Sequence, residues 1–311
     1  MPATAKSPKN SMLDISTIPP ERRFPSGLDR VLPALTRGLQ HLGLDFFLVG
    51  AVARDLWLDA ALGSAPRRRT TDVDLAVLIA DEGEYEQLRA WLVAHEQFTA
   101  PASSAFCVIH EPTGIQVDLM PFGGIADAEG RVQVAGQGLS RISVVGLAEV
   151  LASATPVKVN EQITWQAVTL PGLVALKLLA WDDRPEQRGK DGTDLRLILQ
   201  HYHALIETDI IERHYELLIA QDPQEEEIMQ MTGIRVLGQE LQTLVAVSPP
   251  LQTRLHNILT QEIQLATASR LALAMSQRIS PTDKTSPTVG QSQKWLRALV
   301  TGLTDELLPP G

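Results

Sequence analysis

Residues 69–79 have the sequence Arg-Thr-Thr-Asp-Val-Asp-Leu-Ala-Val-Leu-Ile, so that Asp72 and Asp74 stand where an apolar strand should begin. Residues two apart on a strand lie on one side, about 6.6 Å apart along the chain. That spacing suits carboxylates that share one or two divalent cations. The run from Leu75 to Ala80 is apolar on both faces, as expected of a central strand covered on both sides. The stretch therefore predicts two acids at the mouth of a buried sheet.

A glycine turn precedes this stretch, and a third acid follows it. Residues 46–56 are typical of an apolar strand, a turn at Gly50 and then a helix. Glycine lets a backbone approach a phosphate, and the free N–H groups of a helix start attract anions. Asp118 lies in the alternating segment 114–120, on the face opposite Ile115, Val117 and Leu119. Three acids on neighbouring strands beside a glycine turn indicate a two-metal phosphoryl-transfer site.

These elements resemble a known superfamily. Gly50, the Asp72-Val73-Asp74 strand and Asp118 are similar to the polymerase-beta-like nucleotidyltransferases, whose pattern is a glycine turn, Asp-x-Asp and a late third Asp. Residues 177–184 and 188–195 resemble the lysine and Lys-Asp-x-x-Asp-Leu elements of the AbiEii-type toxin nucleotidyltransferases. The resemblance spans about residues 44 to 200. Ala51 departs from it, because the family usually has Ser or Gly there, so a hydroxyl contact to the nucleotide is missing.

The resemblance implies roles for the first group of residues. Asp72, Asp74 and Asp118 would hold Mg²⁺ or Mn²⁺, and Asp118 would help to deprotonate the attacking hydroxyl. The nucleotide would contact Gly50, Ala51, Arg54 and Lys177. From its position in the predicted helix, Arg54 is expected to form a surface pair with Asp55, although it lies one turn from the phosphate turn.

Lys177 stands out in the second half of the sequence. Its neighbours three and four positions away on a helix are apolar, so its ammonium must reach solvent or find an anion, and a triphosphate is a candidate anion. The resemblance assigns Asp191 to the site, where it would position Lys177 or a base. Asp194, near the start of the same predicted helix, is expected to cap that helix instead.

The composition describes an ordinary globular protein. The chain has 311 residues, of which 44% are hydrophobic and 21% charged, and a formal net charge of -10. No apolar run approaches the about 20 residues that a membrane span needs, and residues 1–10 lack an apolar signal core, so a cytoplasmic protein is expected. The single cysteine, Cys107, is expected to be buried. The net charge argues against a protein that coats nucleic acid through its overall field, but it is compatible with a local basic groove. Two clusters are candidates for such a groove: Arg67, Arg68 and Arg69, and Arg184, Arg188 and Lys190.

The order of patterns predicts an α/β (α+β) fold, a nucleotidyltransferase core with a mixed sheet flanked by helices, followed by an all-helical C-terminal domain. We expect a flexible tail over 1–25, the core over 26–168 and the helical domain over 169–311. Helices are predicted at 28–42, 52–62, 82–95, 173–183, 191–202, 209–219, 224–231, 234–245, 251–277 and 292–303, and strands near 45–49, 73–80, 104–110, 114–121, 141–145, 156–159 and 163–169.

The functional prediction is a metal-dependent enzyme that moves a nucleoside monophosphate from a nucleoside triphosphate to an acceptor hydroxyl. The toxin-type resemblance implies an RNA acceptor, with the 3′ end of transfer RNA first, and an antitoxin partner. Two alternatives stay open. One is the same chemistry on a small molecule, such as an aminoglycoside, or on a protein hydroxyl. The other is a catalytically inactive regulatory fold, which Ala51 favours.

Overall fold

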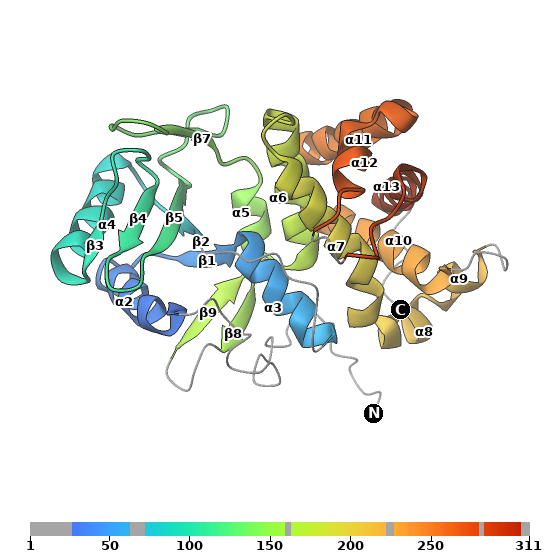
Figure 1. Cartoon of the computed structure of the whole chain (residues 1–311), viewed down its shortest axis with the longest axis horizontal. Coiled ribbons are helices and arrows are strands. Elements are labelled where there is room, and N and C mark those ends of the chain that lie inside the picture. The colour runs from blue at the N-terminus through green and yellow to red at the C-terminus, as the bar shows by residue number, and fades with distance from the viewer. Residues whose placement is uncertain (1–26, 63–71, 159–162, 222–226, 280–282, 306–311) are drawn as a thin grey trace. The chain divides into compact units, whose positions relative to one another are not determined.

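The chain divides into two compact units, Met1–Thr169 and Leu170–Gly311. The structure is a computed structural model, and it describes residues 27–62, 72–158, 163–221, 227–279 and 283–305 (Figure 1). Within these residues the first unit is α/β and the second contains helices only, so the predicted fold class is confirmed.

In the described residues of the first unit, a seven-stranded mixed sheet has the order β3-β4-β5-β2-β1-β9-β8. Its strands are β1 (Phe46–Val49), β2 (Asp72–Leu78), β3 (Phe98–Thr99), β4 (Cys107–His110), β5 (Ile115–Phe122), β8 (Thr155–Lys158) and β9 (Thr164–Ala167). Two further strands, β6 (Arg131–Gln133) and β7 (Arg141–Ser143), pair with each other. At the centre, β2 runs antiparallel to β1 and parallel to β5.

The two faces of the central strands differ. On one face, Val73, Leu75, Val117 and Leu119 are fully buried, whereas the other face carries the half-buried acids. Apolar cover on both faces extends only from Leu75 to Val77, because Leu78 is 38% exposed. The prediction of a strand covered on both sides over 75–80 is therefore too long. The acid-bearing face of β2 is partly open near the start of the strand.

Helices of the first unit are α2 (Leu28–His41), α3 (Gly50–Leu62), α4 (Glu82–His95) and α5 (Leu147–Leu151). Asp81 caps α4, since its Oδ1 accepts a hydrogen bond from the Glu84 N–H at 3.0 Å. The Tyr85 hydroxyl of α4 lies 3.1 Å from the carbonyl oxygens of Ala105 and Leu119, which fixes this helix to the β4–β5 region. Trp57 of α3 donates its indole N–H to the Val168 carbonyl at 2.8 Å.

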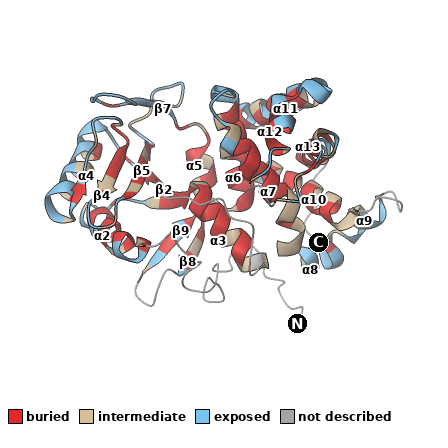
Figure 2. Cartoon of the chain, viewed as in Figure 1, coloured by how far each residue is buried: buried red, intermediate tan, exposed pale blue. Residues whose placement is uncertain are grey.

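The described helices of the second unit surround a core of their own, drawn red along α6 and α7 in Figure 2. They are α6 (Leu170–Asp183), α7 (Gly189–Leu205), α8 (Glu207–Arg213), α9 (Tyr215–Ile219), α10 (Ile228–Val245), α11 (Pro249–Gln264), η3 (Ala266–Ala268), α12 (Arg270–Met275) and α13 (Val289–Thr304). In the described parts of the chain, no helix has both the length and the apolar character of a membrane span.

A buried arginine anchors the segment between α12 and α13. Arg196 of α7 is fully buried, and its guanidinium donates to the Gln277 carbonyl at 2.9 Å and to the Asp283 carboxylate at 2.8 Å. Burial alone would raise the pKa of Asp283, but hydrogen bonds from the Ile279 N–H and from Arg196 outweigh it and lower that pKa.

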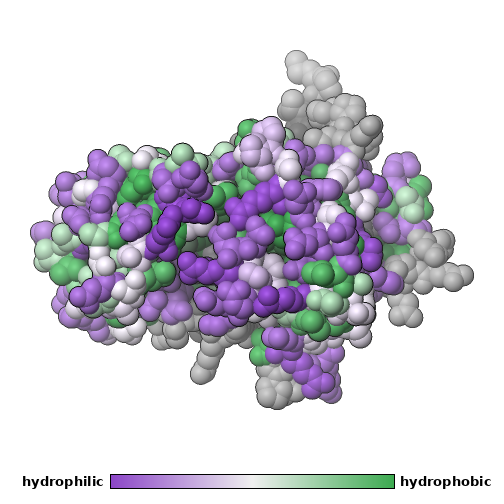
Figure 3. Space-filling view, turned by 90° about the horizontal axis from the view of Figure 1, so that it is seen from above, coloured by the Kyte–Doolittle hydropathy of each residue, from purple (hydrophilic) through white to green (hydrophobic). Residues whose placement is uncertain are grey.

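On the face shown in Figure 3, apolar residues form small patches among hydrophilic ones.

Candidate active site

The sheet brings the three predicted acids onto one face. Asp72 and Asp74 are two residues apart on β2, and Asp118 of β5 lies in register with Asp74 on the neighbouring parallel strand. Residues in register on adjacent strands point to the same side and stand about 4.8 Å apart. All three acids are half-buried. The carboxylates therefore gather on a partly open surface of two adjacent strands.

Gly50 adjoins this acidic face. It is the first residue of α3 and has a φ of 69°, in the left-handed region that favours glycine. A Cβ atom at this position would overlap the Asp74 carboxylate, and it would lie 2.9 Å from the Cβ of Asp74. The missing side chain thus lets the start of α3 and the start of β2 meet. Ala51, the next residue, is 6% exposed.

Two polar side chains contact the third acid. Gln116 Nε2 donates to Asp118 Oδ1 at 2.8 Å, and the Cys107 thiol forms a hydrogen bond with the same carboxylate. Burial raises the pKa of Asp118, with a further increase from the charge of Asp72, while these two hydrogen bonds act in the opposite direction. Cys107 is buried, as predicted.

The sequence patterns do not single out Gln116, and they do not place Cys107 beside the acids. Gln116 precedes Asp118 by two residues, the same spacing that puts Asp72 and Asp74 on one face. That spacing was the available signal for Gln116. The place of Cys107 depends on the pairing of β4 with β5, in which Cys107 is opposite Asp118.

The acids do not form a ready-made metal cage. Within the residues that the structure describes, no group of three or more His, Cys, Asp or Glu side chains is arranged to hold a metal ion. Asp72 and Asp74 each have further interactions in the structure. Their side chains share a face of the sheet with that of Asp118.

Arg54 is not at the surface, which corrects the prediction of a surface pair with Asp55. Its side chain is fully buried, and its Nε and Nη2 lie 2.9 and 2.5 Å from Asp55 Oδ1. Another acid of α3, Asp59, is only 1% exposed. The two residues do pair, but the pair is buried, and an ion pair inside the protein compensates part of the cost of removing the charges from water.

Lys177 finds its anions within the second unit. Its Nζ lies 2.7 Å from Asp191 Oδ1 and 2.6 Å from Asp194 Oδ2, and the three side chains are no more than 13% exposed. Burial would lower the pKa of Lys177, but the charges of Asp194 and Asp191 raise it. The prediction that Asp194 caps α7 is wrong, because this residue lies inside the helix and pairs with Lys177. Asp191 contacts Lys177, and its role in a nucleotide site stays a prediction.

The second predicted basic cluster is exposed. Arg184, Arg188 and Lys190 lie between the end of α6 and the first turn of α7, with their side chains in solvent. Arg188 also reaches Asp191, at 3.7 Å between Nη1 and Oδ2. The other cluster, Arg67, Arg68 and Arg69, falls outside the described residues.

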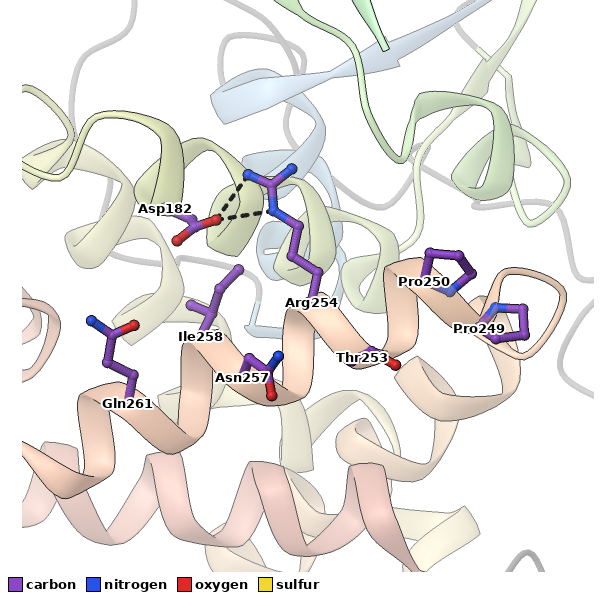
Figure 4. A pocket seen from close by; sticks show the side chains of 8 residues that line it. All are labelled: Asp182, Pro249, Pro250, Thr253, Arg254, Asn257, Ile258 and Gln261. Carbon is purple, nitrogen blue, oxygen red and sulfur yellow. Dashed lines mark hydrogen bonds and ion pairs between the residues drawn. The ribbon is translucent and has the colours of Figure 1, made fainter. Parts of the chain in front are cut away.

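An open groove of about 570 Å³ lies along α11 of the second unit (Figure 4). Thr253, Asn257 and Gln261 recur every four residues along one side of the helix. Arg254 bridges the groove to the end of α6 through 2.8 Å ion pairs with both Asp182 and Asp183. The charge of this guanidinium is therefore matched by neighbouring carboxylates, and the groove carries no reactive centre of its own.

Comparisons with known proteins agree with the nucleotidyltransferase resemblance. The family described as "Nucleotidyl transferase AbiEii toxin, Type IV TA system" matches residues 34–289. Among curated proteins, none matches the sequence. The solution structure of the antibiotic-resistance factor ANT(2'')-Ia is similar with a TM-score of 0.33 and 13% identity, over 62% of this chain and 95% of that one. That likeness is too weak to carry any conclusion about this chain.

Proposed function

Because the chain belongs to the AbiEii family of toxin nucleotidyltransferases, we propose that it transfers a nucleoside monophosphate from a nucleoside triphosphate to an RNA hydroxyl. The 3′ end of transfer RNA is the proposed acceptor, and pyrophosphate is the leaving group. One observation carries the proposal: Asp74 and Asp118 are in register, with Asp72 on the same face, beside the Gly50 turn. Such a face offers acids to an attacking hydroxyl and a helix start to a phosphate.

The acidic face also fits a divalent cation, Mg²⁺ or Mn²⁺. Its donors are hard carboxylate oxygens, and the charge of Asp72 is among the causes that raise the pKa of Asp118, so the acids repel one another. Mg²⁺ is usually held by one or two carboxylates together with substrate phosphates, so a preformed cage of three side chains is not required. Asp72, Asp74 and Asp118 would hold the ion, which when bound neutralises phosphate charge.

The side chains and backbone of the first unit have distinct tasks in this proposal. The N–H groups at the start of α3, from Gly50 and Ala51 onward, bind phosphate oxygens. Asp118 accepts the proton as the O–H bond of the acceptor breaks. The acceptor oxygen forms a new bond to the α-phosphorus, the bond from that phosphorus to the bridging oxygen breaks, and pyrophosphate departs. The raised pKa of Asp118 suits a proton acceptor.

Lys177 is proposed to bind the triphosphate, with Asp191 as the residue that orients it. With one cation between two carboxylates, the trio in the second unit has an excess of negative charge as it stands. A triphosphate would thus have to take the place of a carboxylate beside Nζ. Arg188, which is exposed and reaches Asp191, could then take over that carboxylate.

The acceptor is the finer part of the proposal. The exposed Arg184, Arg188 and Lys190 favour an anionic acceptor, and phosphate contacts from such side chains supply affinity for RNA. The family implies an antitoxin that counteracts the activity. The net charge of -10 limits the basic surface to a local one.

The test incubates the purified chain with each α-labelled nucleoside triphosphate, Mg²⁺ or Mn²⁺ and total RNA. Label on transfer RNA is the expected result. Label only on an added aminoglycoside or on protein would show a different acceptor, and no label anywhere would show an inactive fold. Asp72→Asn and Asp74→Asn should each lower transfer by about 100-fold or more, because charge stabilisation is lost.

Asp45→Asn is the matched control. Asp45 is exposed and precedes β1 at the end of that strand remote from Asp74, since Phe46 pairs with Val77. The control should keep wild-type activity and the same melting temperature. Full activity in both Asp72→Asn and Asp74→Asn would refute the assignment of the acids.

A further inference from the structure

Helix α9 is apolar and yet exposed. Its apolar residues are Tyr215, Leu217, Leu218 and Ile219, and none of them is buried. Of the α-helices in the described residues, α9 is the only one without a buried residue, and Figure 2 draws it without red. Figure 1 shows it beside α8 and α10 at one end of the second unit. Because apolar area is normally buried in folding or in association, this helix is a candidate contact surface.

The exposed apolar side chains of this region are clustered. Ile211 of α8 and Tyr215 and Ile219 of α9 are 52%, 53% and 56% exposed. They follow one another at intervals of four residues, and only His214 separates the two helices. Scattered single apolar residues are normal on a protein surface, whereas a group of large ones marks a site of interaction. We call Ile211, Tyr215 and Ile219 together the α8–α9 face.

Acidic side chains accompany the α8–α9 face. Residues 207–219 contain four acids, and Arg213 is the single lysine or arginine among them. Its Nη1 lies 3.7 Å from Asp209 Oδ1, so its charge is matched within the helix. The three other acids are exposed: Glu207, Glu212 and Glu216. The apolar side chains therefore stand in a negatively charged surrounding near neutral pH.

This charge selects among the surfaces that could cover the α8–α9 face. RNA and anionic membranes carry phosphate groups, which the acids repel. A second copy of the chain in a two-fold contact would bring the same acids against one another, on a protein whose net charge is already -10. A protein surface with apolar side chains and a basic rim meets both requirements, because it covers the apolar centre and pairs with the acids.

We propose that the α8–α9 face docks a basic protein partner. The partner packs apolar side chains against Ile211, Tyr215 and Ile219. Its lysine or arginine side chains pair with Glu212 and Glu216, which alternate with the apolar residues in the sequence. Tyr215 is the expected anchor, because it is the middle residue of the three and tyrosine is enriched among the residues that dominate binding energy. The proposal goes beyond nucleotide transfer and does not depend on it.

The experiment measures the binding of two labelled synthetic peptides to the full chain by fluorescence anisotropy. Both have about 15 residues, a length at which a helix can form, with leucines at helical spacing. The first has lysines at the remaining positions, and the second has glutamates there. The Leu/Lys peptide should bind and the Leu/Glu peptide should not. Binding of the Leu/Lys peptide should weaken as salt is added, because exposed charges are screened.

Tyr215→Ser should weaken binding of the Leu/Lys peptide by about 10-fold or more, as loss of an interface anchor does. The double variant Glu212→Lys/Glu216→Lys should weaken it as well and reduce its dependence on salt. Leu273→Ser is the matched control, since Leu273 is a 44% exposed apolar residue on another helix, α12, and this variant should bind as the wild type does. Circular dichroism melts show that each variant is folded.

Absence of binding by the Leu/Lys peptide, or equal binding of the two peptides, would overturn the proposal. So would binding that Tyr215→Ser leaves unchanged. Sedimentation velocity that finds a dimer of the wild type and a monomer of Tyr215→Ser would assign the α8–α9 face to a second copy instead. Binding of a labelled RNA oligonucleotide that Tyr215→Ser abolishes would assign it to RNA. None of these measurements uses nucleotide transfer, so this proposal and the proposed function can fail separately.

Discussion

Asp118 combines a chemical role with a cost in stability. Burial and the charge of Asp72 raise its pKa, so the native state binds the proton of this acid more tightly than the unfolded state does. The stabilisation that comes from this tighter proton binding is fully present below the pKa of Asp in the unfolded chain, about 3.9. It is lost as the pH rises through the higher native pKa. Once the carboxyl group ionises, the chain carries a charged group that opposes folding.

This sign predicts the behaviour of Asp118→Asn. The variant should lose nucleotide transfer and yet melt higher than the wild type at pH 7, by roughly 2 °C for a chain of this size. The gain should shrink as the pH falls and the native acid takes up its proton. Thermal melts followed by circular dichroism at several pH values measure the effect, with Asp45→Asn as the control. A lower melting temperature than the wild type at pH 7 would show that the ionised Asp118 stabilises the fold.

At the scale of elements, two glycines let α10 and α13 cross closely. A Cβ on Gly302 of α13 would overlap the Arg235 carbonyl, and a Cβ on Gly238 of α10 would overlap the Leu299 carbonyl. A Cβ built on Gly238 would also lie 2.8 Å from the Cα of Gly302, and one built on Gly302 would lie 2.9 Å from the Cα of Gly238, closer than real Cβ atoms come. Each helix therefore needs glycine where the backbones meet.

Gly302→Ala should destabilise the chain by about 1–3 kcal/mol, because the added methyl group forces two packed helices apart. Gly290→Ala, in the first turn of α13, is the matched control. A Cβ there meets only the Thr288 hydroxyl at 3.8 Å, so the helix propensity of Ala should make this change neutral or stabilising. Urea unfolding followed by circular dichroism gives both values. Equal stability of the two variants would contradict the close crossing.

Local sequence patterns predicted most helices and strands. They failed where contacts between residues far apart in the sequence determine where a helix begins, ends or breaks. Helix α4 has the predicted bounds, Glu82–His95. The helices predicted over 224–231 and 234–245 are joined, since α10 (Ile228–Val245) continues through Gly233. A Cβ on Gly233 would lie 2.7 Å from the Cβ of His203, so this helix passes close to α7 there. Conversely, the helix predicted over 251–277 is broken, since Ser269 caps α12 with its hydroxyl. The predicted helix over 209–219 is likewise divided at His214.

The candidate site shows the same division between local and distant information. The spacing of Asp72 and Asp74 is a local signal, which is why the sequence predicted their shared face. The register of Asp74 with Asp118 depends on the pairing of β2 with β5, across more than 40 residues that a strand period does not determine. The partners of Lys177 and the burial of Arg54 depend likewise on how helices pack, and the sequence assigned Asp194 and Arg54 wrongly for that reason.

At the scale of the whole molecule, the second unit has the means to fold by itself. The second unit, Leu170–Gly311, buries its own apolar side chains, among them Leu178, Leu195, Leu237, Leu241 and Leu299. Its charged groups are also paired internally, including Lys177 with Asp191 and Asp194 and Arg196 with Asp283. Burial of apolar area is the main force for folding, and a unit of this length is within the usual range of domains.

Residues 170–311, produced alone, should therefore be helical and unfold cooperatively, yet they should not transfer nucleotides, because the three acids lie in the first unit. Circular dichroism melts of this fragment measure the first expectation, and the labelled-nucleotide assay measures the second. Gly302→Ala in the fragment should lower its stability as it does in the full chain, since α10 and α13 both lie within it, whereas Gly290→Ala should not. A broad, non-cooperative melt would mean that the core of the second unit forms only as part of the longer chain. So would a melting temperature that Gly302→Ala does not change.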